Sequence, residues 1–335
     1  MTKCPRLPFH PSGHRGLVLV AILLEGCHPP AQPPTTASPA QTAEELTWSG
    51  IAKSGQKDFA GAAADFNAAL ALRPDDADVV YNLGLAQSAQ KDYPGAIAAF
   101  TRALALTPGD AEILLSRGTA AFYEQDYDPA IADYNRAIAL NPKYTEAFYA
   151  RALARRRKGD FDGASADYDH ALELDPNFWM AYNGRATPHN AHGDFALAIS
   201  DYEKRIQLRP DGDEYAWFQR SLLLQRLGRP GDDGLAKQAA SWPDSWTKTV
   251  GQFLLGQVNA DELLRLAEVA ADAQTRREQE CEANHYVGIT ALLAGRTAEA
   301  KEKFTACMAT NVNTFLEYTL SRAELARMAA NGGGG

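Results

Sequence analysis

The most restrictive feature of this sequence is a pattern that recurs every 34 residues across residues 43–212. No residue is inserted or lost between its five copies, so each copy must fold in the same local way. Every copy carries an aspartate followed by an aromatic residue, and these aromatic residues are Phe59, Tyr93, Tyr127, Phe161 and Phe195. A period of this length is typical of solenoids, in which one supersecondary unit stacks on the next.

Small residues recur at two further positions of the unit. Position eight is Gly50, Gly84, Gly118, Ala152 and Ala186, and position twenty is Ala62, Ala96, Ala130, Ala164 and Ala198. Small side chains at these places let two antiparallel helices approach closely, and a larger one would cost about 1 to 3 kcal/mol. A proline closes each copy at Pro74, Pro108, Pro142, Pro176 and Pro210. Because proline has no amide hydrogen and disfavours helix in the residue before it, the second helix must end there.

This pattern resembles the tetratricopeptide repeat, whose 34-residue unit is a helix-turn-helix. The resemblance implies an all-α fold, a right-handed superhelix (α-solenoid) with a concave side, followed by a divergent helical C-terminal part. The formal net charge is −9. This charge argues against nucleic acid as a main partner, because phosphate contacts need a clustered basic face.

The beginning of the chain is typical of an exported bacterial lipoprotein. Basic residues precede an apolar run at residues 17–24, which is too short to span a bilayer but has the length of a signal-peptide core. The run ends Leu24-Glu25-Gly26-Cys27, which resembles a lipobox and implies cleavage before Cys27 and acylation (palmitate) of that cysteine. An ordinary secretion signal and an uncleaved anchor are the alternatives. His28 in place of aspartate favours the outer membrane, with the protein facing the periplasm of a Gram-negative bacterium.

We therefore expect six segments along the chain. They are a signal peptide (1–26), a Pro-rich tether (27–42), five tandem repeats (43–212), a degenerate helical region (213–280), a C-terminal repeat with a capping helix (281–331) and a disordered tail (332–335).

The third, fourth and fifth copies carry arginine at position seven and aspartate at position twenty-three. This covariation predicts an ion pair between the two helices of each repeat, largely shielded from water: Arg117 with Asp133, Arg151 with Asp167, and Arg185 with Asp201. In the second copy both positions are apolar, Leu83 and Ala99. A structural role for these pairs is favoured over ligand binding.

In the repeat family, positions two, five, nine, twelve and thirteen of the first helix line the concave groove. Carried over to this chain, they give a peptide-binding groove that is apolar and aromatic with a basic patch, formed by Tyr81, Leu85, Leu115, Phe122, Tyr149, Leu153, Arg156 and Asn183. Such a groove suits an extended or helical peptide with hydrophobic anchors and an acidic group. The alternative is that some of these side chains only pack against neighbouring repeats.

Pro188 stands inside the first helix of the fifth copy, where the missing amide predicts a kink or an early end. His189 and His192 follow, but no third ligand accompanies them, so we expect no metal site. No cofactor is implied either.

Beyond the repeats, the sequence predicts helices at residues 214–227, 233–240 and 245–255, and a further helix capped by Asn259 that reaches about Gln274. The repeat pattern returns from Cys281, and a last helix from Phe315 to about Ala329 would cap the open end.

Two cysteines, Cys281 and Cys307, remain once Cys4 leaves with the signal and Cys27 takes lipid. They occupy positions one and twenty-seven of one antiparallel helix pair, which brings the start of one helix beside the end of the other. In an oxidising compartment a disulfide is favoured, and two buried thiols are the alternative.

The C-terminal part carries a closer resemblance. The segment EANHYVGITALLAGRTAEAKEKFTACMATNVNTFLEYTLSRAEL (282–325), together with DEYAWFQRSLLL and the lipobox, is similar to the NlpI-type repeat lipoproteins of Gram-negative bacteria. The resemblance implies a membrane-anchored periplasmic adaptor that binds other envelope proteins through its groove, including a tail-specific protease and peptidoglycan hydrolases. The alternative is a pilotin-like assembly factor for a secretin, pilus or other envelope complex. Whether the chain forms a homodimer is left open by the sequence.

No catalytic pattern stands out. We find no Ser-His-Asp, Cys-His or paired-carboxylate arrangement and no glycine-rich phosphate loop before a helix, so we do not expect an enzyme.

Overall fold

The computed structural model describes residues 39–210, 214–229, 233–313 and 315–332. Within these ranges all regular secondary structure is α-helical. The predicted signal peptide, Cys27 and most of the predicted tether lie outside the described residues, as does most of the predicted tail. Among the described helices, none combines the length and the apolar composition that crossing a bilayer requires.

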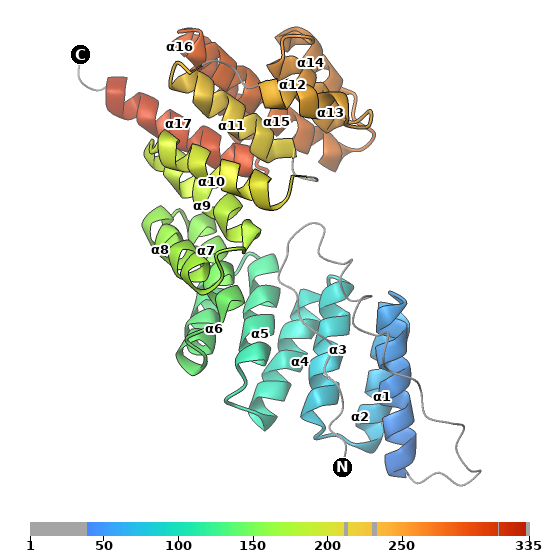
Figure 1. Cartoon of the computed structure of the whole chain (residues 1–335). Helices are drawn as coiled ribbons and strands as arrows, with labels where there is room; N and C mark the ends of the chain where they lie inside the picture. Colours follow the sequence, from blue (N-terminus) through green and yellow to red (C-terminus); the bar gives the residue numbers. More distant parts are fainter. Residues whose placement is uncertain (1–38, 211–213, 230–232, 314, 333–335) are drawn as a thin grey trace. The chain divides into compact units, whose positions relative to one another are not determined.

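The first ten helices supply two helices to each of the five repeats, and four of these couples pack as antiparallel pairs (Figure 1). The pairs are α1 (Pro39–Gly55) with α2 (Phe59–Leu72), α3 (Ala77–Ala89) with α4 (Tyr93–Leu106), α5 (Ala111–Tyr123) with α6 (Tyr127–Leu140), and α9 (Trp179–His192) with α10 (Phe195–Leu208). The fourth repeat consists of α7 (Thr145–Lys158) and α8 (Phe161–Leu174), which belong to different compact units. The first helix begins at Pro39, so the last residues of the predicted tether are helical. Proline is well suited to the first turn of a helix, where its missing amide hydrogen has no partner to lose.

The repeated aspartate marks the start of each second helix, and the repeated proline follows its end. The side chain of Asp58 accepts a hydrogen bond from the Gly61 amide at 2.9 Å, and Asp92 does the same for Gly95 at 3.0 Å. Each carboxylate thereby satisfies one of the amides that a helix start leaves unpaired. At the other end α2 stops at Leu72, just before the Arg73-Pro74 step.

The turn inside each pair uses a left-handed residue at position fifteen of the unit. In the first three pairs this residue is Lys57, Lys91 and Gln125, with φ between 63° and 64°. In the fourth and fifth pairs it is Gly159 and Gly193, with φ of 86° and 94°. Glycine adopts this conformation without the clash that a Cβ atom causes, so the later turns are the less strained ones.

The close approach within a pair is visible at Gly84. A Cβ atom added there would lie 2.6 Å from Cε1 of Phe100, which is fully buried. The glycine and the aromatic ring therefore fill one shared space, and this is why position eight is small wherever position twenty-four is a large ring.

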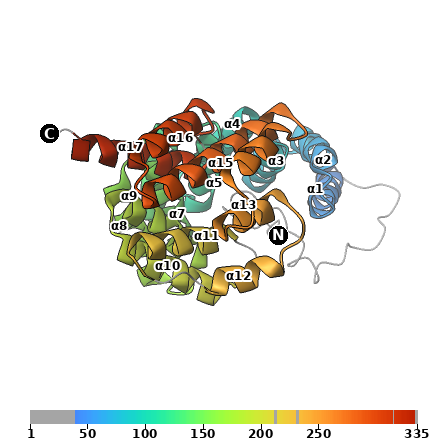
Figure 2. The same ribbon diagram turned by 90° about the horizontal axis from the view of Figure 1, so that it is seen from above.

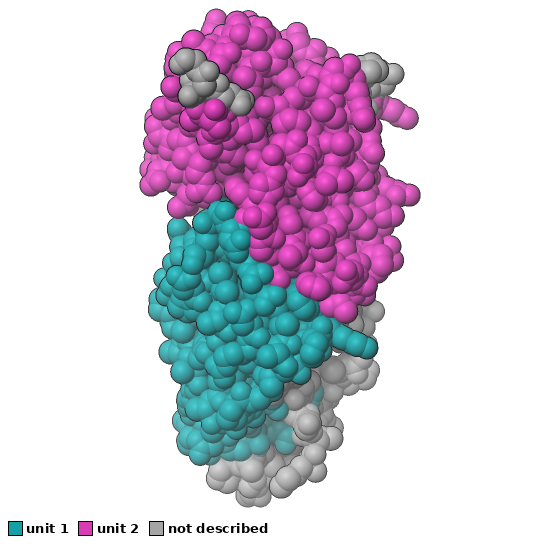
Figure 3. Space-filling model, turned by 90° about the vertical axis from the view of Figure 1, so that its left-hand side faces the viewer, with its two compact units in different colours: residues 1–160 teal, residues 161–335 magenta. Residues whose placement is uncertain are grey.

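The described chain divides into two compact units, residues 1–160 and 161–335, coloured separately in Figure 3. The division falls between α7 and α8, inside the fourth of the five repeats that the sequence predicts over residues 43–212.

Unit 2 continues after α10 with seven helices in its described part. They are α11 (Glu214–Arg226), α12 (Asp233–Ala240), α13 (Trp246–Leu254), α14 (Ala260–Glu268), α15 (Ala273–Leu293), α16 (Thr297–Ala309) and α17 (Leu316–Gly332). Their core gathers Phe218, Trp242 and Tyr286, whose rings meet edge to face.

Two sequence expectations for this region are wrong. The helix that follows Asn259 ends at Glu268 and does not reach Gln274. The next helix, α15, begins at Ala273, because the Asp272 side chain accepts from the amides of Gln274 and Thr275, both at 2.9 Å. The expected boundary between residues 280 and 281 therefore lies inside one continuous helix.

Pro188 does not end its helix early. It is buried, and α9 continues past it to His192. The helix is held in unit 2 by its packing against α8, α10 and α17. Such tertiary contacts outweigh the loss of one backbone hydrogen bond.

The last helix is more than a cap. It packs against α16 and α15, as a capping helix would, but it also lies against α9, which comes more than a hundred residues earlier (Figure 2).

Candidate protein-binding groove

The predicted groove begins with position five of each first helix, and here the structure corrects the sequence. Tyr81 and Leu115 are 0% exposed and Tyr149 is 8% exposed. Neighbouring first helices of unit 1 are in contact with each other, so Tyr81 and Leu115 are closed in between repeats and present almost no surface to a partner. The alternative, that some of the expected residues pack against neighbouring repeats, applies to these two.

The Tyr81 hydroxyl shows what position five does. It donates a hydrogen bond to Glu112 Oε1 at 3.2 Å and lies 3.2 Å from Ser116 Oγ, so it ties α3 to α5. Burial and the charge of Glu112 raise the pKa of Tyr81 well above its usual range. The hydroxyl therefore stays protonated, as a hydrogen-bond donor should.

Positions nine and twelve remain partly open to solvent. Leu85, Leu153 and Arg156 are half-buried on α3 and α7, and Phe122 is half-buried near the end of α5. Leu85 and Phe122 rest on the core of unit 1 with part of their surface left over. Of the expected groove residues in unit 1, these four have side-chain surface for a partner.

An aromatic cluster stands at the end of α5, and we define it as Tyr93, Phe122, Tyr123 and Tyr127. The rings of Tyr93 and Tyr123 stack with centroids 5.2 Å apart and planes 13° from parallel. Phe122 meets Tyr123 edge on at 5.6 Å. Tyr123 is 38% exposed, so the stack presents a ring to solvent. Burial raises the pKa of the Tyr123 hydroxyl, and the positive charge of Arg157 opposes this rise.

Sequence reasoning missed an acidic row at position two. Asp78, Glu112 and Glu146 fall 34 residues apart at the starts of α3, α5 and α7, and all are half-buried. Carboxylates in a first turn are stabilised by the positive end of the helix dipole. The 34-residue spacing of these three carboxylates is visible in the sequence, but only apolar residues were considered as groove residues at position two.

The basic run at the end of α7 is partly engaged. Arg155 lies 3.7 Å from Asp160, and Lys158 pairs with Asp128 of α6. Carboxylates therefore neutralise at least two of its four cations. Asn183 belongs to α9 in unit 2, where it is half-buried.

Two of the three predicted ion pairs are present. Arg117 Nη2 lies 2.7 Å from Asp133 Oδ1, and Arg185 Nη2 lies 2.6 Å from Asp201 Oδ1. The aspartates are buried, while each arginine keeps about a fifth of its side chain exposed. Arg151 and Asp167 fall in different units, and their pairing stays a prediction.

The same arginines also reach backward, which the sequence did not predict. Each donates through Nη1 to position twenty-five of the preceding repeat: Arg117 to Thr101 at 3.1 Å, Arg151 to Asn135 at 2.6 Å, and Arg185 to Asp169 at 2.5 Å. One guanidinium thus serves two consecutive repeats. This arrangement supports a structural role for the arginines, because their donors are turned into the array.

Cys281 and Cys307 are buried free thiols in this structure, with their Sγ atoms 2.7 Å apart. The hydrogen bond between the two sulfur atoms and their burial raise the pKa of Cys281. The two residues lie as the antiparallel pairing of α15 with α16 requires. Whether they are oxidised in the cell stays a prediction.

The geometry defines a class of protein: an all-α array of helix pairs whose first helices present a partly open surface to a partner. Family models for the tetratricopeptide repeat match residues 49–111, 111–144 and 149–214. The region that contains α1 to α10 consists of tetratricopeptide repeats. Arrays of this kind use their concave surfaces as scaffolds for binding proteins and peptides.

Several solved structures share the fold. A tetratricopeptide repeat protein from Parabacteroides merdae is 19% identical, with a TM-score of 0.54 over 84% of this chain and 98% of its own. PilW, described as a type IV pilus biogenesis factor, is 20% identical (TM-score 0.56, 62% and 97%). PilF of Pseudomonas aeruginosa is 16% identical (TM-score 0.55, 64% and 98%). A search of curated proteins found no significant match.

Proposed function

We propose that this protein is a lipid-anchored adaptor of the bacterial envelope, and that unit 1 binds a segment of another envelope protein. The position of the proposed binding site is supported by one observation. Tyr123 is a large ring left 38% exposed on a first helix, stacked on Tyr93, while the position-five residues of the same surface are buried. Exposed aromatic residues with rigid support are typical energetic anchors of protein interfaces.

The charges beside the cluster indicate the partner's chemistry. The acidic row of Asp78, Glu112 and Glu146 lies at the starts of α3, α5 and α7, and Arg156 and Arg157 lie at the far end of α7. A bound segment with an apolar anchor, basic groups toward one end and an acidic group toward the other would match this arrangement. Proteases and peptidoglycan hydrolases, as implied by the NlpI-type resemblance, are the partners to seek first.

The anchor rests on Cys27 and the preceding signal. Replacing Cys27 by serine should move the protein from the membrane fraction to the soluble periplasm and abolish labelling by a palmitate analogue. If the Cys27→Ser protein stays labelled and membrane-bound, the anchor is elsewhere and the proposed location is wrong.

The binding proposal is tested by capture from detergent-solubilised envelope extract. Tyr123→Ala should lower recovery of the partner about tenfold or more, as loss of an interface anchor does. Leu140→Ala is the matched control, because Leu140 is 51% exposed but ends α6, a second helix. Both variants should keep the wild-type melting temperature. Equal recovery with Tyr123→Ala and wild type would rule out this surface.

A second candidate is a pilotin-like assembly factor. Its support is the fold that the chain shares with PilF and PilW. The same capture separates the two candidates, because a secretin or pilus subunit would be recovered in place of a protease or wall hydrolase.

A further inference from the structure

The last helix of unit 2, α17, covers two first helices of that unit. It packs against α9, the first helix of the fifth repeat, and against α15 and α16, the two helices of the last helix pair. First helices are the ones that line the concave side of such an array. The chain's own C-terminal helix therefore covers this part of unit 2.

The inward face of α17 has the spacing of a helix bound in a groove. Glu317, Leu320, Ser321 and Glu324 follow at i, i+3, i+4 and i+7, and each is no more than 3% exposed. Three of these four side chains are polar. The rest of unit 2 therefore binds α17 mainly through hydrogen bonds and ion pairs, with Leu320 as the apolar anchor.

Two of the polar contacts join α17 to α15. Glu317 Oε1 accepts a hydrogen bond from the Tyr286 hydroxyl at 2.9 Å. Ser321 Oγ lies 2.9 Å from His285 Nδ1.

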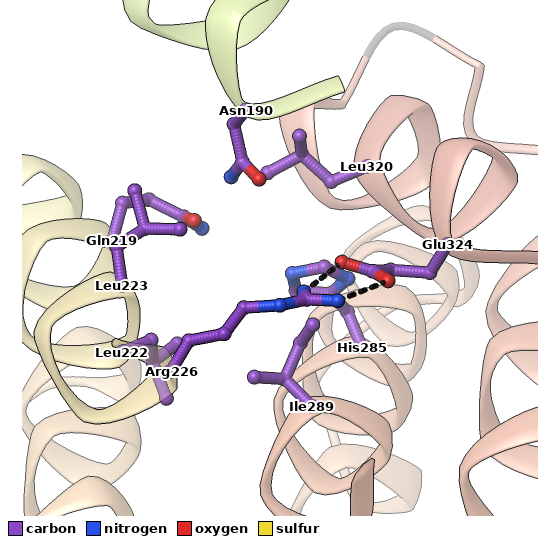
Figure 4. Close-up of a pocket in the computed structure, with 9 residues that line it drawn as sticks. All are labelled: Asn190, Gln219, Leu222, Leu223, Arg226, His285, Ile289, Leu320 and Glu324. Atoms are coloured by element: carbon purple, nitrogen blue, oxygen red, sulfur yellow. Dashed lines mark hydrogen bonds and ion pairs between the residues drawn. The ribbon is translucent and has the colours of Figure 1, made fainter. Parts of the chain in front are cut away.

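The third polar residue, Glu324, binds two arginines. Arg226 of α11 donates Nη2 to Glu324 Oε2 at 3.1 Å and pairs through Nη1 with the other oxygen, as Figure 4 shows. Arg327 also donates to Glu324, and its Nη1 reaches the carbonyl oxygens of Asn190 and Ala191 at 2.8 and 2.7 Å. These carbonyls belong to the last turn of α9, where a cation is favoured by the helix dipole.

The surface of α9, α11 and α15 that holds α17, here called its seat, does not fit the helix completely. A cavity of about 10 Å³, room for roughly one water molecule, lies among α9, α11, α15 and α17 (Figure 4). Asn190 Oδ1 and His285 Nε2, from residues that line it, are buried without a hydrogen-bond partner in the described part of the chain. Buried polar atoms are almost always paired in a settled core. The seat thus has hydrogen-bonding capacity that α17 leaves unused.

We propose that this surface of unit 2 is a helix-binding site, and that α17 is its resident ligand and can be displaced. The incoming partner is an amphipathic helix of another protein with carboxylates at i and i+7 around a Leu-Ser pair at i+3 and i+4. Arg226 and Tyr286 would bind its carboxylates, as they bind those of α17. This inference rests on the proposed protein-binding function and adds a second, self-covered site to it.

The test uses the full chain and a fluorescein-labelled peptide with the sequence of residues 316–328. In the wild type the peptide must compete with a tethered helix at high effective concentration, so binding should be weak. Glu324→Ala removes the partner of Arg226 and Arg327 from α17 but not from the peptide, so the peptide Kd should fall at least tenfold. Adding Arg226→Ala to that variant should abolish the gain. Glu262→Ala, which breaks an exposed ion pair on α14, is the control and should leave the Kd unchanged.

Hydrogen exchange on the wild type keeps the proposal open to refutation if Glu324→Ala fails to fold. Amides of α17 should exchange at least tenfold faster than those of α15, since α17 leaves its seat without unfolding the unit. Equal protection of the two helices, or a folded Glu324→Ala chain with wild-type peptide affinity, would overturn the inference. Either result leaves the proposed function standing, because that function is decided by capture through Tyr123 in unit 1.

Discussion

Arg117 of α5 grips Asp133 of α6 with two parallel hydrogen bonds, Nε to Oδ2 and Nη2 to Oδ1, both 2.7 Å long. The fork of the guanidinium matches the two oxygens of the carboxylate, and the Asp133 hydrogen bond raises the pKa of Arg117. The pair joins the two helices of the third repeat, where the second repeat has Leu83 and Ala99.

Removing one partner of this pair should destabilise the chain more than removing both. Asp133→Ala leaves Arg117 without its main acceptor, and we expect a loss of about 2 to 3 kcal/mol, below the range for fully buried pairs because Arg117 is partly exposed. Arg117→Leu with Asp133→Ala copies the second repeat and should recover most of the loss. Urea unfolding measures both. A double variant no more stable than Asp133→Ala would contradict the argument.

Tyr81 should behave as a core residue and not as a binding residue. Tyr81→Ala opens a cavity and strands Glu112 and Ser116, so we expect a loss of about 3 to 5 kcal/mol. Tyr81→Phe keeps the ring and should cost only about 1 kcal/mol. Thermal unfolding checks both values. A Tyr81→Ala chain that melts like the wild type would restore Tyr81 to the groove.

The stability of unit 2 should fall between about pH 6.5 and 8 because of Glu282. Burial and the nearby Glu317 raise the pKa of Glu282 to about 8 from an ordinary 4.5. Between these values the folded chain holds a proton that the unfolded chain has lost, so the free energy of unfolding falls as pH rises. Burial lowers the pKa of His285 to about 4, which gives the opposite slope up to about pH 6.5. Above that pH the opposing contribution of His285 has ended.

The variant Glu282→Gln isolates this effect. A glutamine oxygen in the place of Glu282 Oε2 still accepts from Tyr215 and Trp246, which donate to that oxygen at 3.1 and 2.7 Å, but glutamine does not titrate. One proton gives a slope of at most about 1.4 kcal/mol per pH unit. Urea unfolding followed by tryptophan fluorescence at pH 6.5 and 8 should show the fall in the wild type only. The same pH dependence in both proteins would mean that another group is responsible.

Cys281 and Cys307 should be oxidised if the protein is exported to an oxidising compartment, as proposed. Their Sγ atoms are 2.7 Å apart in the reduced chain, and a bridge would close a segment whose ends are 26 residues apart. The chain-entropy model gives about 3 kcal/mol for such a loop. Thiol alkylation of the denatured protein, before and after reduction, counts the bridge. Cys281→Ser should lose the same stability as reduction does, and full alkylation without reductant would show two thiols.

Much of the repeat region could be predicted from sequence because its determinants are local. The aspartate that precedes the conserved-position aromatic of each repeat, as Asp58 precedes Phe59, predicts where a second helix begins. A proline such as Pro74 predicts where that helix ends. The pairing of Arg117 with Asp133 was also predictable, since both residues lie within one helix hairpin whose register the period defines.

Position five of the groove could not be assigned in the same way. Whether Tyr81 faces a partner or the next repeat depends on how closely α3 and α5 approach, and that is a relation between repeats. The backward hydrogen bonds of Arg117 and Arg151 were missed for the same reason.

The period-34 pattern by itself determined the fold class, the ends of the second helices and two of the ion pairs inside the repeats. These follow from contacts within one short hairpin, where a side chain's position along the helix decides what it meets. Only the tertiary structure decided that Tyr81 is core, that α15 is one helix and that α17 returns to α9. Burial of Tyr81 depends on residues 31 and 35 positions later in the next repeat. The return of α17 to α9 depends on contacts more than a hundred positions apart, such as Arg327 with Asn190, for which the sequence carries no periodic signal.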